Sequence, residues 1–205
     1  MPAPSIRLAA PEDGPALAAI YAPSVIGSAT SFELEAPDGD EMARRIASVS
    51  SRTPWLVCEM RGEVAGYAYA SKHRERPAYQ WSVDVSAYVR DDFRRRGIGR
   101  AMYSSLVAVL SLQGFRNAYA GIALPNPASV RLHESLGFTT IGVYRSVGYK
   151  LGAWHDVMWL GRTLAPHDAS PRVPLPLSEL RTQRALSAAL ATGLPLLHLD
   201  ARHPR

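Results

Sequence analysis

The sequence predicts one mixed α/β domain followed by a proline-rich tail. Apolar runs of strand length alternate with amphipathic stretches of helix length as far as residue 164, and turn signals such as Arg61-Gly62 separate them. Beyond Leu164 the composition changes, because four prolines lie between residues 166 and 176. We therefore expect a domain over residues 1–164 and a tail over residues 165–205, with residues 177–190 as its candidate C-terminal helix.

Several elements carry clear local signals. Residues 81–89 alternate apolar and polar side chains, which is typical of a strand that buries one face. Gly114 is a natural stop for the long helix before it, and Asn126-Pro127 combines an N-cap with a proline at the first helical position. We expect helices over residues 11–21, 38–50, 99–113 and 126–137, and strands over residues 5–9, 55–60, 64–70, 81–89, 115–123, 139–149 and 153–164.

The composition is that of a protein with its own hydrophobic core. Hydrophobic residues make up 47% of the chain, so we expect neither a disulfide framework nor a metal. The single cysteine, Cys58, lies in the apolar run 55–60 and is interpreted as a small buried side chain rather than a catalytic thiol. The first residues lack the features of a signal peptide, and no apolar run reaches membrane-spanning length. These features favour the cytoplasm and argue against a membrane partner.

The net charge of +5 raises nucleic acid as a partner. Residues 162–205 contain six arginines, no lysine and three acidic residues, so they carry +3 of this charge and the rest of the chain carries +2. Nucleic-acid-binding domains concentrate basic side chains on a folded face. We therefore expect no nucleic-acid partner. The alternative, binding through the basic tail, would depend steeply on salt.

The segment 89–101, Val-Arg-Asp-Asp-Phe-Arg-Arg-Arg-Gly-Ile-Gly-Arg-Ala, is the most informative part of the chain. It follows a predicted strand and opens a predicted helix, and Gly97 and Gly99 allow a tight turn whose N–H groups point at one spot. The positive end of the helix suits a pyrophosphate. The pattern is neither the Walker motif nor the dinucleotide fingerprint, and a solvated turn with an ordinary cap is the alternative. Positive charge around the turn comes from Arg94, Arg95, Arg96 and Arg100.

A second signal lies on the predicted helix that begins at Asn126. Asn126, Ser129 and His133 share one face of it, whereas Leu132 and Leu136 share another that can pack inward. A polar stripe beside an apolar one indicates a helix that buries one side and carries functional side chains on the other. The alternative for His133 is an exposed or internally satisfied histidine.

These motifs together resemble the GNAT acyltransferase superfamily and, more narrowly, the phosphinothricin N-acetyltransferases, which include the bialaphos-resistance enzymes conferring herbicide resistance. The resemblance runs from about Ile6 to Leu164. It implies a central, mostly antiparallel, splayed sheet flanked by helices. The matching motifs are Arg94-x-x-Gly97-x-Gly99, Trp55-Leu-Val, Gly62-Glu-Val-Ala-Gly66, Ala78-Tyr-x-Trp81, Gln113-Gly-Phe115, Leu124-Pro-Asn126, Ser129-Val-Arg131, His133-Glu134, Gly137-Phe138 and Gly152-x-Trp-His-Asp-Val157.

The resemblance implies acetyl-CoA as co-substrate and direct transfer of its acetyl group to an amine. The amides of Gly97, Ile98, Gly99, Arg100 and Ala101 would hold the pyrophosphate. The strand at Tyr88, Val89 and Arg90 would pair with the pantetheine arm. Asn126, with Ser129 on the same helix face, would contact the pantetheine or help to orient groups near the thioester.

Two residues are the candidates for catalysis. Asp84 stands where the phosphinothricin enzymes carry a glutamate taken as the general base; aspartate is one methylene shorter, so a water relay is an alternative to direct contact. His133 stands where those enzymes have histidine, and either ring nitrogen could donate to the leaving sulfur or accept from the amine. The alternative for Asp84 is a polar strand residue that faces solvent.

The resemblance also implies which residues bind the acceptor amine. The loop 72–79 would recognise the anionic groups of an amino acid analogue, because the planar guanidinium suits a carboxylate or phosphinate. Its candidate residues are Arg74, Arg76 and Tyr79, and Phe32 would supply an apolar wall. We expect acetylation of phosphinothricin, methionine sulfoximine or methionine sulfone.

Two other readings stay open. The acceptor could be an antibiotic, a polyamine or a protein N-terminus, or the chain could be a non-catalytic acyl-CoA-binding module. Relatives imply a homodimer.

Overall fold

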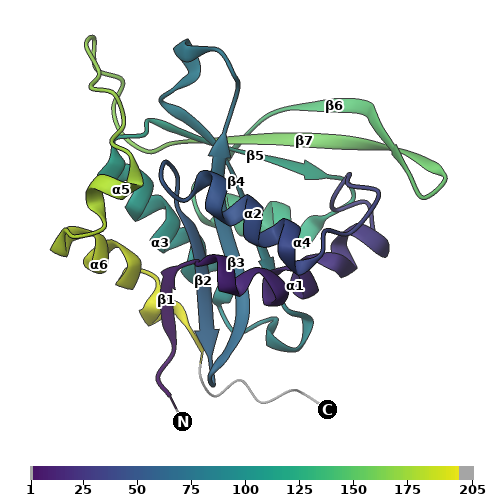
Figure 1. Ribbon diagram of the computed structural model, residues 1–205. Helices are drawn as coiled ribbons and strands as arrows, with labels where there is room; N and C mark the ends of the chain where they lie inside the picture. Colours follow the sequence, from purple (N-terminus) through teal and green to yellow (C-terminus); the bar gives the residue numbers. More distant parts are fainter. Residues whose placement is uncertain (1, 199–205) are drawn as a thin grey trace.

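The computed structural model describes residues 2–198 and contains a seven-stranded sheet between two layers of helices (Figure 1). The strand order is β1-β2-β3-β4-β5-β7-β6, and every neighbouring pair is antiparallel except β4 and β5. The predicted mixed, mostly antiparallel sheet is therefore confirmed. The strands are β1 Ser5–Leu8, β2 Trp55–Met60, β3 Glu63–Lys72, β4 Ser82–Val89, β5 Asn117–Ala123, β6 Thr139–Lys150 and β7 Ala153–Thr163.

Four helices cover the two faces of this sheet. α1 (Gly14–Ile26) and α2 (Gly39–Val49) pack on one face, and α3 (Ile98–Gln113) and α4 (Pro127–Ser135) pack on the other. Short 3₁₀ turns lie at Pro11–Asp13, Pro77–Tyr79, Asp91–Phe93 and Leu194–Leu196. None of the described helices is both long and apolar enough to span a bilayer.

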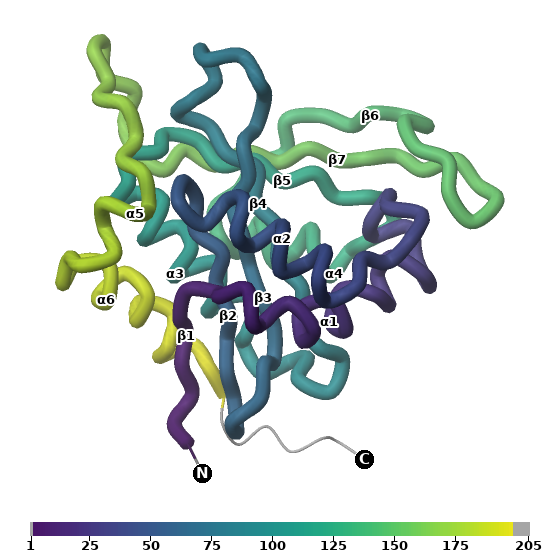
Figure 2. Tube along the Cα trace, viewed as in Figure 1, coloured from purple at the N-terminus to yellow at the C-terminus, as the bar shows by residue number. Residues whose placement is uncertain are grey.

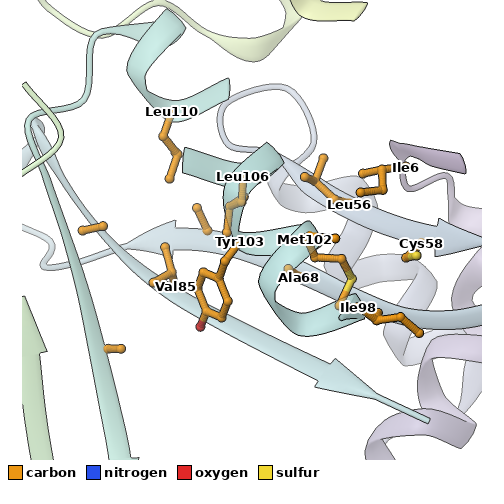
Figure 3. Packing of buried hydrophobic residues seen from close by; sticks show 14 of the residues in the cluster. Ile6, Leu56, Cys58, Ala68, Val85, Ile98, Met102, Tyr103, Leu106 and Leu110 are labelled. Carbon is orange, nitrogen blue, oxygen red and sulfur yellow. The ribbon is translucent and has the colours of Figure 1, made fainter. Parts of the chain in front are cut away.

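The side chains of β2 show how one strand serves both layers. Trp55 and Val57 point into the cluster beneath α1 and α2, whereas Leu56 and Cys58 point into the cluster beneath α3 (Figure 3). This alternation is the period of a strand that is buried on both sides. Burial raises the pKa of the Cys58 thiol to about 12, which agrees with the interpretation of this residue as a small apolar side chain.

The first helix differs from its prediction. The expected helix over residues 11–21 begins as a 3₁₀ turn and then continues as α1 to Ile26, past Pro23. A proline inside a helix lacks one N–H donor and is usually a stop signal. Here Tyr21 and Val25 are both buried, so packing on either side of the proline keeps the helix intact.

The sheet splays in its middle. β5 pairs with β4 only where Ser82, Val83 and Asp84 face Asn117, Ala118 and Tyr119, and the remainder of β4 pairs with β3 alone. From residue 85 onward the outer edge of β4 has no strand neighbour among the described residues. β6 and β7 then extend from the body of the molecule as a long arm (Figure 1).

The tail packs along the outside of α3 (Figure 2). The predicted single helix over residues 177–190 is instead two short helices, α5 (Leu177–Leu180) and α6 (Arg184–Ala191), because Gln183 is extended between them. The bend lets Leu177, Leu180 and Leu186 all bury against Val109 of α3. Residues 199–205 of the predicted tail lie outside the described part.

We predict that the tail contributes to the stability of the whole domain. Leu180→Ala should lower the free energy of unfolding by about 2–5 kcal/mol, because the leucine is buried and its removal leaves a cavity. Urea denaturation measures this effect, and Val173→Ala, at an exposed position of the same tail, is the matched control. Equal midpoints for both variants would show that the tail unfolds separately from the sheet.

Candidate functional site

A cavity of about 520 Å³ opens where β4 and β5 diverge. Its walls come from the two splayed strands, from the β6–β7 arm and from the loop after α1. Asp84 and Trp159 provide polar and aromatic surface within it. The lining residues are Thr30, Phe32, Ser71, Asp84, Val85, Ser86, Gly121, Ala123, Tyr144, Val147, Val157 and Trp159.

A second, narrower cavity of about 60 Å³ adjoins the first. The two share five lining residues, and the narrower one also contacts Tyr103, Asn126, Ser129 and His133. The predicted catalytic residues Asp84 and His133 therefore face adjoining spaces at the same break in the sheet. The shared residues are Thr30, Val85, Ser86, Gly121 and Ala123.

Asp84 is held by the loop that follows β3. The ring of His73 places Nδ1 2.6 Å from Oδ1 of Asp84, and Nη1 of Arg74 lies 4.0 Å from Oδ2. Burial raises the pKa of the Asp84 carboxyl group, and the hydrogen bond from His73 and the charge of Arg74 oppose that rise. Buried carboxyl groups with raised pKa values are typical of general bases.

His133 is buried and has a partner at each ring nitrogen. Nδ1 lies 2.8 Å from the carbonyl oxygen of Ser129, and Nε2 lies 2.8 Å from the hydroxyl oxygen of Tyr103. Since a carbonyl only accepts, Nδ1 carries the proton and Nε2 accepts from Tyr103. Burial lowers the pKa of the His133 imidazole below 6.5. His133 and Tyr103 therefore form a hydrogen-bonded pair. Figure 3 shows Tyr103 beside Val85 in the core.

The turn before α3 has unused N–H groups. Gly97 is left-handed (φ 76°), and no hydrogen bond within residues 2–198 uses the N–H of Ile98, Gly99 or Arg100. The N–H of Ala101 is different, because it donates to the carbonyl of Gly97. Free N–H groups at the positive end of a sixteen-residue helix fit a phosphate. The pyrophosphate site over residues 97–101 stays a prediction, and the N–H groups available for it are those of residues 98–100.

The arginines around this turn differ in their contacts. Arg90 pairs with Glu63 and Asp92, and Arg94 pairs with Asp91. The Arg96 side chain is buried, and its Nη1 has no hydrogen-bond partner among the described residues. Arg95 and Arg100 are exposed. Arg95 and Arg100 have no acidic partner among the described residues and are thus best placed to reach a phosphate, whereas the side chains of Arg90 and Arg94 first have to leave their acidic partners.

The end of the tail packs against the same turn. The N–H of His198 donates to the carbonyl of Arg96 at 3.0 Å, and the Leu196 carbonyl lies where a side chain on Gly97 would project. One helical turn further on, Gly193 lies against the carbonyl of Ala101. These contacts are made by backbone atoms. The side chains of Leu194, Leu196 and Leu197 pack on the core cluster that contains Ile98 and Ala101.

Of the predicted pantetheine residues, Tyr88, Asn126 and Ser129 line the narrower cavity, whereas Val89 and Arg90 are not part of its wall. Tyr88 lies on the splayed part of β4, and Val89 and Arg90 continue the strand toward the turn. Asn126 caps α4, because its Oδ1 accepts from the N–H of Ser129 at 3.1 Å. This bond leaves the side-chain N–H₂ group of Asn126 as a donor at the cavity.

The predicted acceptor residues fall into two groups. Phe32 lines the larger cavity, and Arg74 lies beside it, with its guanidinium 5.6 Å from the ring centre of Trp159. Arg76 and Tyr79 are not part of the cavity wall; Arg76 is exposed, and the Tyr79 ring lies 5.8 Å from that of His73. The structure therefore brings Phe32 and Arg74 together with Asp84 and places the other two residues further out.

Three residues of the site were not identified from the sequence. His73 lies within the loop 72–79, but nothing local to the sequence pairs it with Asp84, eleven residues away. Tyr103 occupies a core-facing position of α3, where an aromatic side chain predicts only packing. Trp159 lies in the last strand. No group of three or more potential metal ligands gathers in the part of the chain that the structure describes.

Comparison with known proteins places these features in context. Residues 6–159 match the family model described as an acetyltransferase (GNAT) domain. The chain is 39% identical to the phosphinothricin N-acetyltransferase of Streptomyces viridochromogenes (85% of this chain, 95% of the relative). It is 36% identical to the L-methionine sulfoximine/L-methionine sulfone acetyltransferase of Pseudomonas aeruginosa (82% and 98%). A crystal structure of a GNAT superfamily phosphinothricin acetyltransferase from Sinorhizobium meliloti in complex with acetyl-CoA superposes with a TM-score of 0.78 (35% identity, 83% and 94%).

We predict that His133 is neutral at pH 7. Because burial disfavours the imidazolium, its pKa should lie below the ordinary value of 6.5, so protonation occurs only in more acidic solution. An NMR titration of the ring resonances measures this pKa, with the His133→Gln variant identifying the signal. A midpoint at or above 6.5 would contradict the paired arrangement with Tyr103.

Proposed function

We propose, from the premise that this chain belongs to the GNAT acetyltransferase family, that it acetylates the amino group of a small amino acid analogue that carries a carboxylate or phosphinate. It has the GNAT fold and is an acetyl-CoA-dependent N-acetyltransferase. Acetyl-CoA supplies the acetyl group as a thioester. The acceptor class that we propose is that of phosphinothricin, methionine sulfoximine and methionine sulfone, which are the substrates in the names of the relatives.

The charge next to the larger cavity supports an anionic acceptor. Arg74 adds a guanidinium at its edge, 4.0 Å from Asp84, while Phe32 and Val147 provide apolar wall. A carboxylate or phosphinate bound by Arg74 would bring the neighbouring ammonium group toward Asp84. A polyamine needs the opposite arrangement, with several acidic side chains around its amines.

Asp84 would act as the general base. The acceptor ammonium must lose a proton before its nitrogen can attack, and Oδ2 of Asp84 is the carboxylate oxygen not bonded to His73. This role needs the ionised carboxylate, so activity should fall when acid protonates Asp84. The shorter aspartate side chain is compatible with transfer through one water.

His133 and Tyr103 would serve the sulfur end of the reaction. Both line the narrower cavity, and the Tyr103 hydroxyl donates to the neutral imidazole. The leaving thiolate needs a hydrogen bond or a proton. We propose that the Tyr103 hydroxyl supplies this hydrogen bond by turning its single proton from Nε2 of His133 to the sulfur, and that His133 holds the hydroxyl in place until the thiolate forms.

We predict a clear preference in a thiol-release assay with acetyl-CoA. Anionic amino acid analogues should give the highest kcat/KM, above polyamines, aminoglycoside-type amines and peptides with a free N-terminus. Arg74→Ala should lower kcat/KM for the anionic acceptors about 10- to 150-fold, as expected for the loss of a charged hydrogen bond worth about 1.5–3 kcal/mol. Equal turnover of all acceptors would contradict this substrate class.

Two controls define the result. Arg76→Ala removes an exposed arginine of the same loop and should have a smaller effect than Arg74→Ala. Asp84→Asn should lower kcat about 10²- to 10⁴-fold, the range for a general base. If Asp84→Asn and His133→Ala both left turnover intact, these residues would not be catalytic, and the reading as a non-catalytic acyl-CoA-binding module would gain support.

We also propose that the protein forms a homodimer. The β6–β7 arm exposes large apolar side chains on a surface that projects from the domain, and such patches are typical of interfaces. Trp154, for example, is 65% exposed. The residues of this patch are Ile141, Tyr144, Val147, Tyr149, Leu151 and Trp154.

We predict that Trp154→Asp shifts the protein toward monomer, because it places a charge within the patch. Sedimentation velocity at several protein concentrations measures the change. Val173→Asp, at an exposed apolar residue of the tail, is the matched control and should leave the assembly unchanged. A wild-type protein that is monomeric at all concentrations would contradict the proposal.

A further inference from the structure

The contact between His73 and Asp84 links the base to a loop residue. His73 directly follows β3, and its Nδ1 lies 2.6 Å from Oδ1 of Asp84 on β4. An ionised carboxylate only accepts hydrogen bonds, so Nδ1 is the donor. The bond occupies Oδ1 on the loop side, and Asp84 also lines the larger cavity.

Aromatic side chains fix the imidazole in this position. The Tyr119 ring of β5 packs against it with centroids 4.5 Å apart, and Tyr79 and Trp159 approach at 5.8 and 6.3 Å. Only 13% of the His73 side chain is exposed. A ring confined on three sides keeps its N–H directed at the carboxylate, so the hydrogen bond does not have to be formed anew in each turnover.

We propose that His73 is a positioning residue for acetyl transfer, one that holds Asp84 in its ionised form with Oδ2 free to receive the proton of the acceptor ammonium. This inference rests on the proposed role of Asp84 as the base. In that step an N–H bond of the ammonium breaks and an O–H bond forms at Oδ2. His73 keeps its own proton on Nδ1 throughout.

The physical need for such a residue follows from burial. Desolvation favours the neutral carboxylic acid, which cannot accept a proton, and it raises the pKa of Asp84. A hydrogen bond from His73 stabilises the anion and lowers that pKa, so removal of the donor should move the acid limb of the pH profile toward higher pH. The charged and titratable groups that face the pair are Arg74 and Tyr79 from the loop, Tyr69 from β3, Tyr119 from β5 and Tyr144 from β6.

Two substitutions separate the hydrogen bond from the packing. His73→Phe keeps an aromatic ring against Tyr119 but has no N–H, whereas His73→Asn keeps an N–H donor near the position of Nδ1 but has no ring. We expect the acid limb of kcat/KM in His73→Phe to lie at higher pH than in wild type, with a loss of activity that is largest at low pH and narrows as pH rises. His73→Asn should restore most of the wild-type profile.

Several outcomes would overturn the inference. It fails if His73→Phe has the wild-type pH profile, or if both variants lose activity equally at every pH, because packing alone would then explain the loss. Asp84→Asn distinguishes this inference from the proposed function. If Asp84→Asn stays active, Asp84 is not the base and both proposals fail. If Asp84→Asn is inactive while His73→Phe keeps the wild-type pH profile, only the role of His73 is contradicted.

A second measurement is made on the wild-type protein and needs no folded His73 variant. Carbon NMR of the wild-type protein can follow the Asp84 carboxyl signal as pH is varied, with the Asp84→Asn variant identifying it. We expect this signal to be that of an ionised carboxylate at the pH of maximal activity. A neutral carboxylic acid at that pH would contradict the proposal.

Discussion

The separation of β4 from β5 after Asp84 is the constraint on which the rest of the structure depends. These strands are the one parallel pair in the described sheet, and they remain together for only three residues on each strand. Beyond that point each strand leaves one edge without its neighbour, which is unfavourable for a buried backbone unless another group supplies the missing hydrogen bonds. The divergence therefore creates both the space of the site and a strip of polar backbone that an extended co-substrate can satisfy.

The same burial has opposite electrostatic effects on the two catalytic candidates. Loss of solvent disfavours the charged form of any group, so it raises the pKa of Asp84 and lowers that of His133. An ionised carboxylate in this place needs compensating donors, which the loop after β3 provides. A neutral imidazole needs none, and its two nitrogens are satisfied by a backbone carbonyl and the Tyr103 hydroxyl. The surroundings of Asp84 thus stabilise a charged group, whereas the surroundings of His133 favour a neutral one.

Local sequence signals predicted most of the fold and only part of the site. Gly97 and Gly114 mark the two ends of α3, because each adopts a left-handed conformation that favours glycine, and the capping role of Asn126 follows from its place before Pro127. The partners His73 and Tyr103 were missed because each is defined by a contact across the fold, thirty residues away in the case of Tyr103. The helices of the tail were the most difficult to predict. Packing on α3 separates them at Gln183, and no glycine or proline in the sequence marks this break.

α3 contacts both the tail and the residues of the candidate site. Its first turn presents the free amides, Tyr103 one turn later contacts His133, and Ser105 beyond it donates to the Leu190 carbonyl while accepting from the N–H of Gly193. N–H groups without a partner within the helix are costly to bury, so the first turn of α3 gains from packing support. The backbone contacts of residues 193–198 provide it from the outer side. The tail leucines bury against Val109 further along the same helix, so the tail contacts α3 both at its first turn and in its second half.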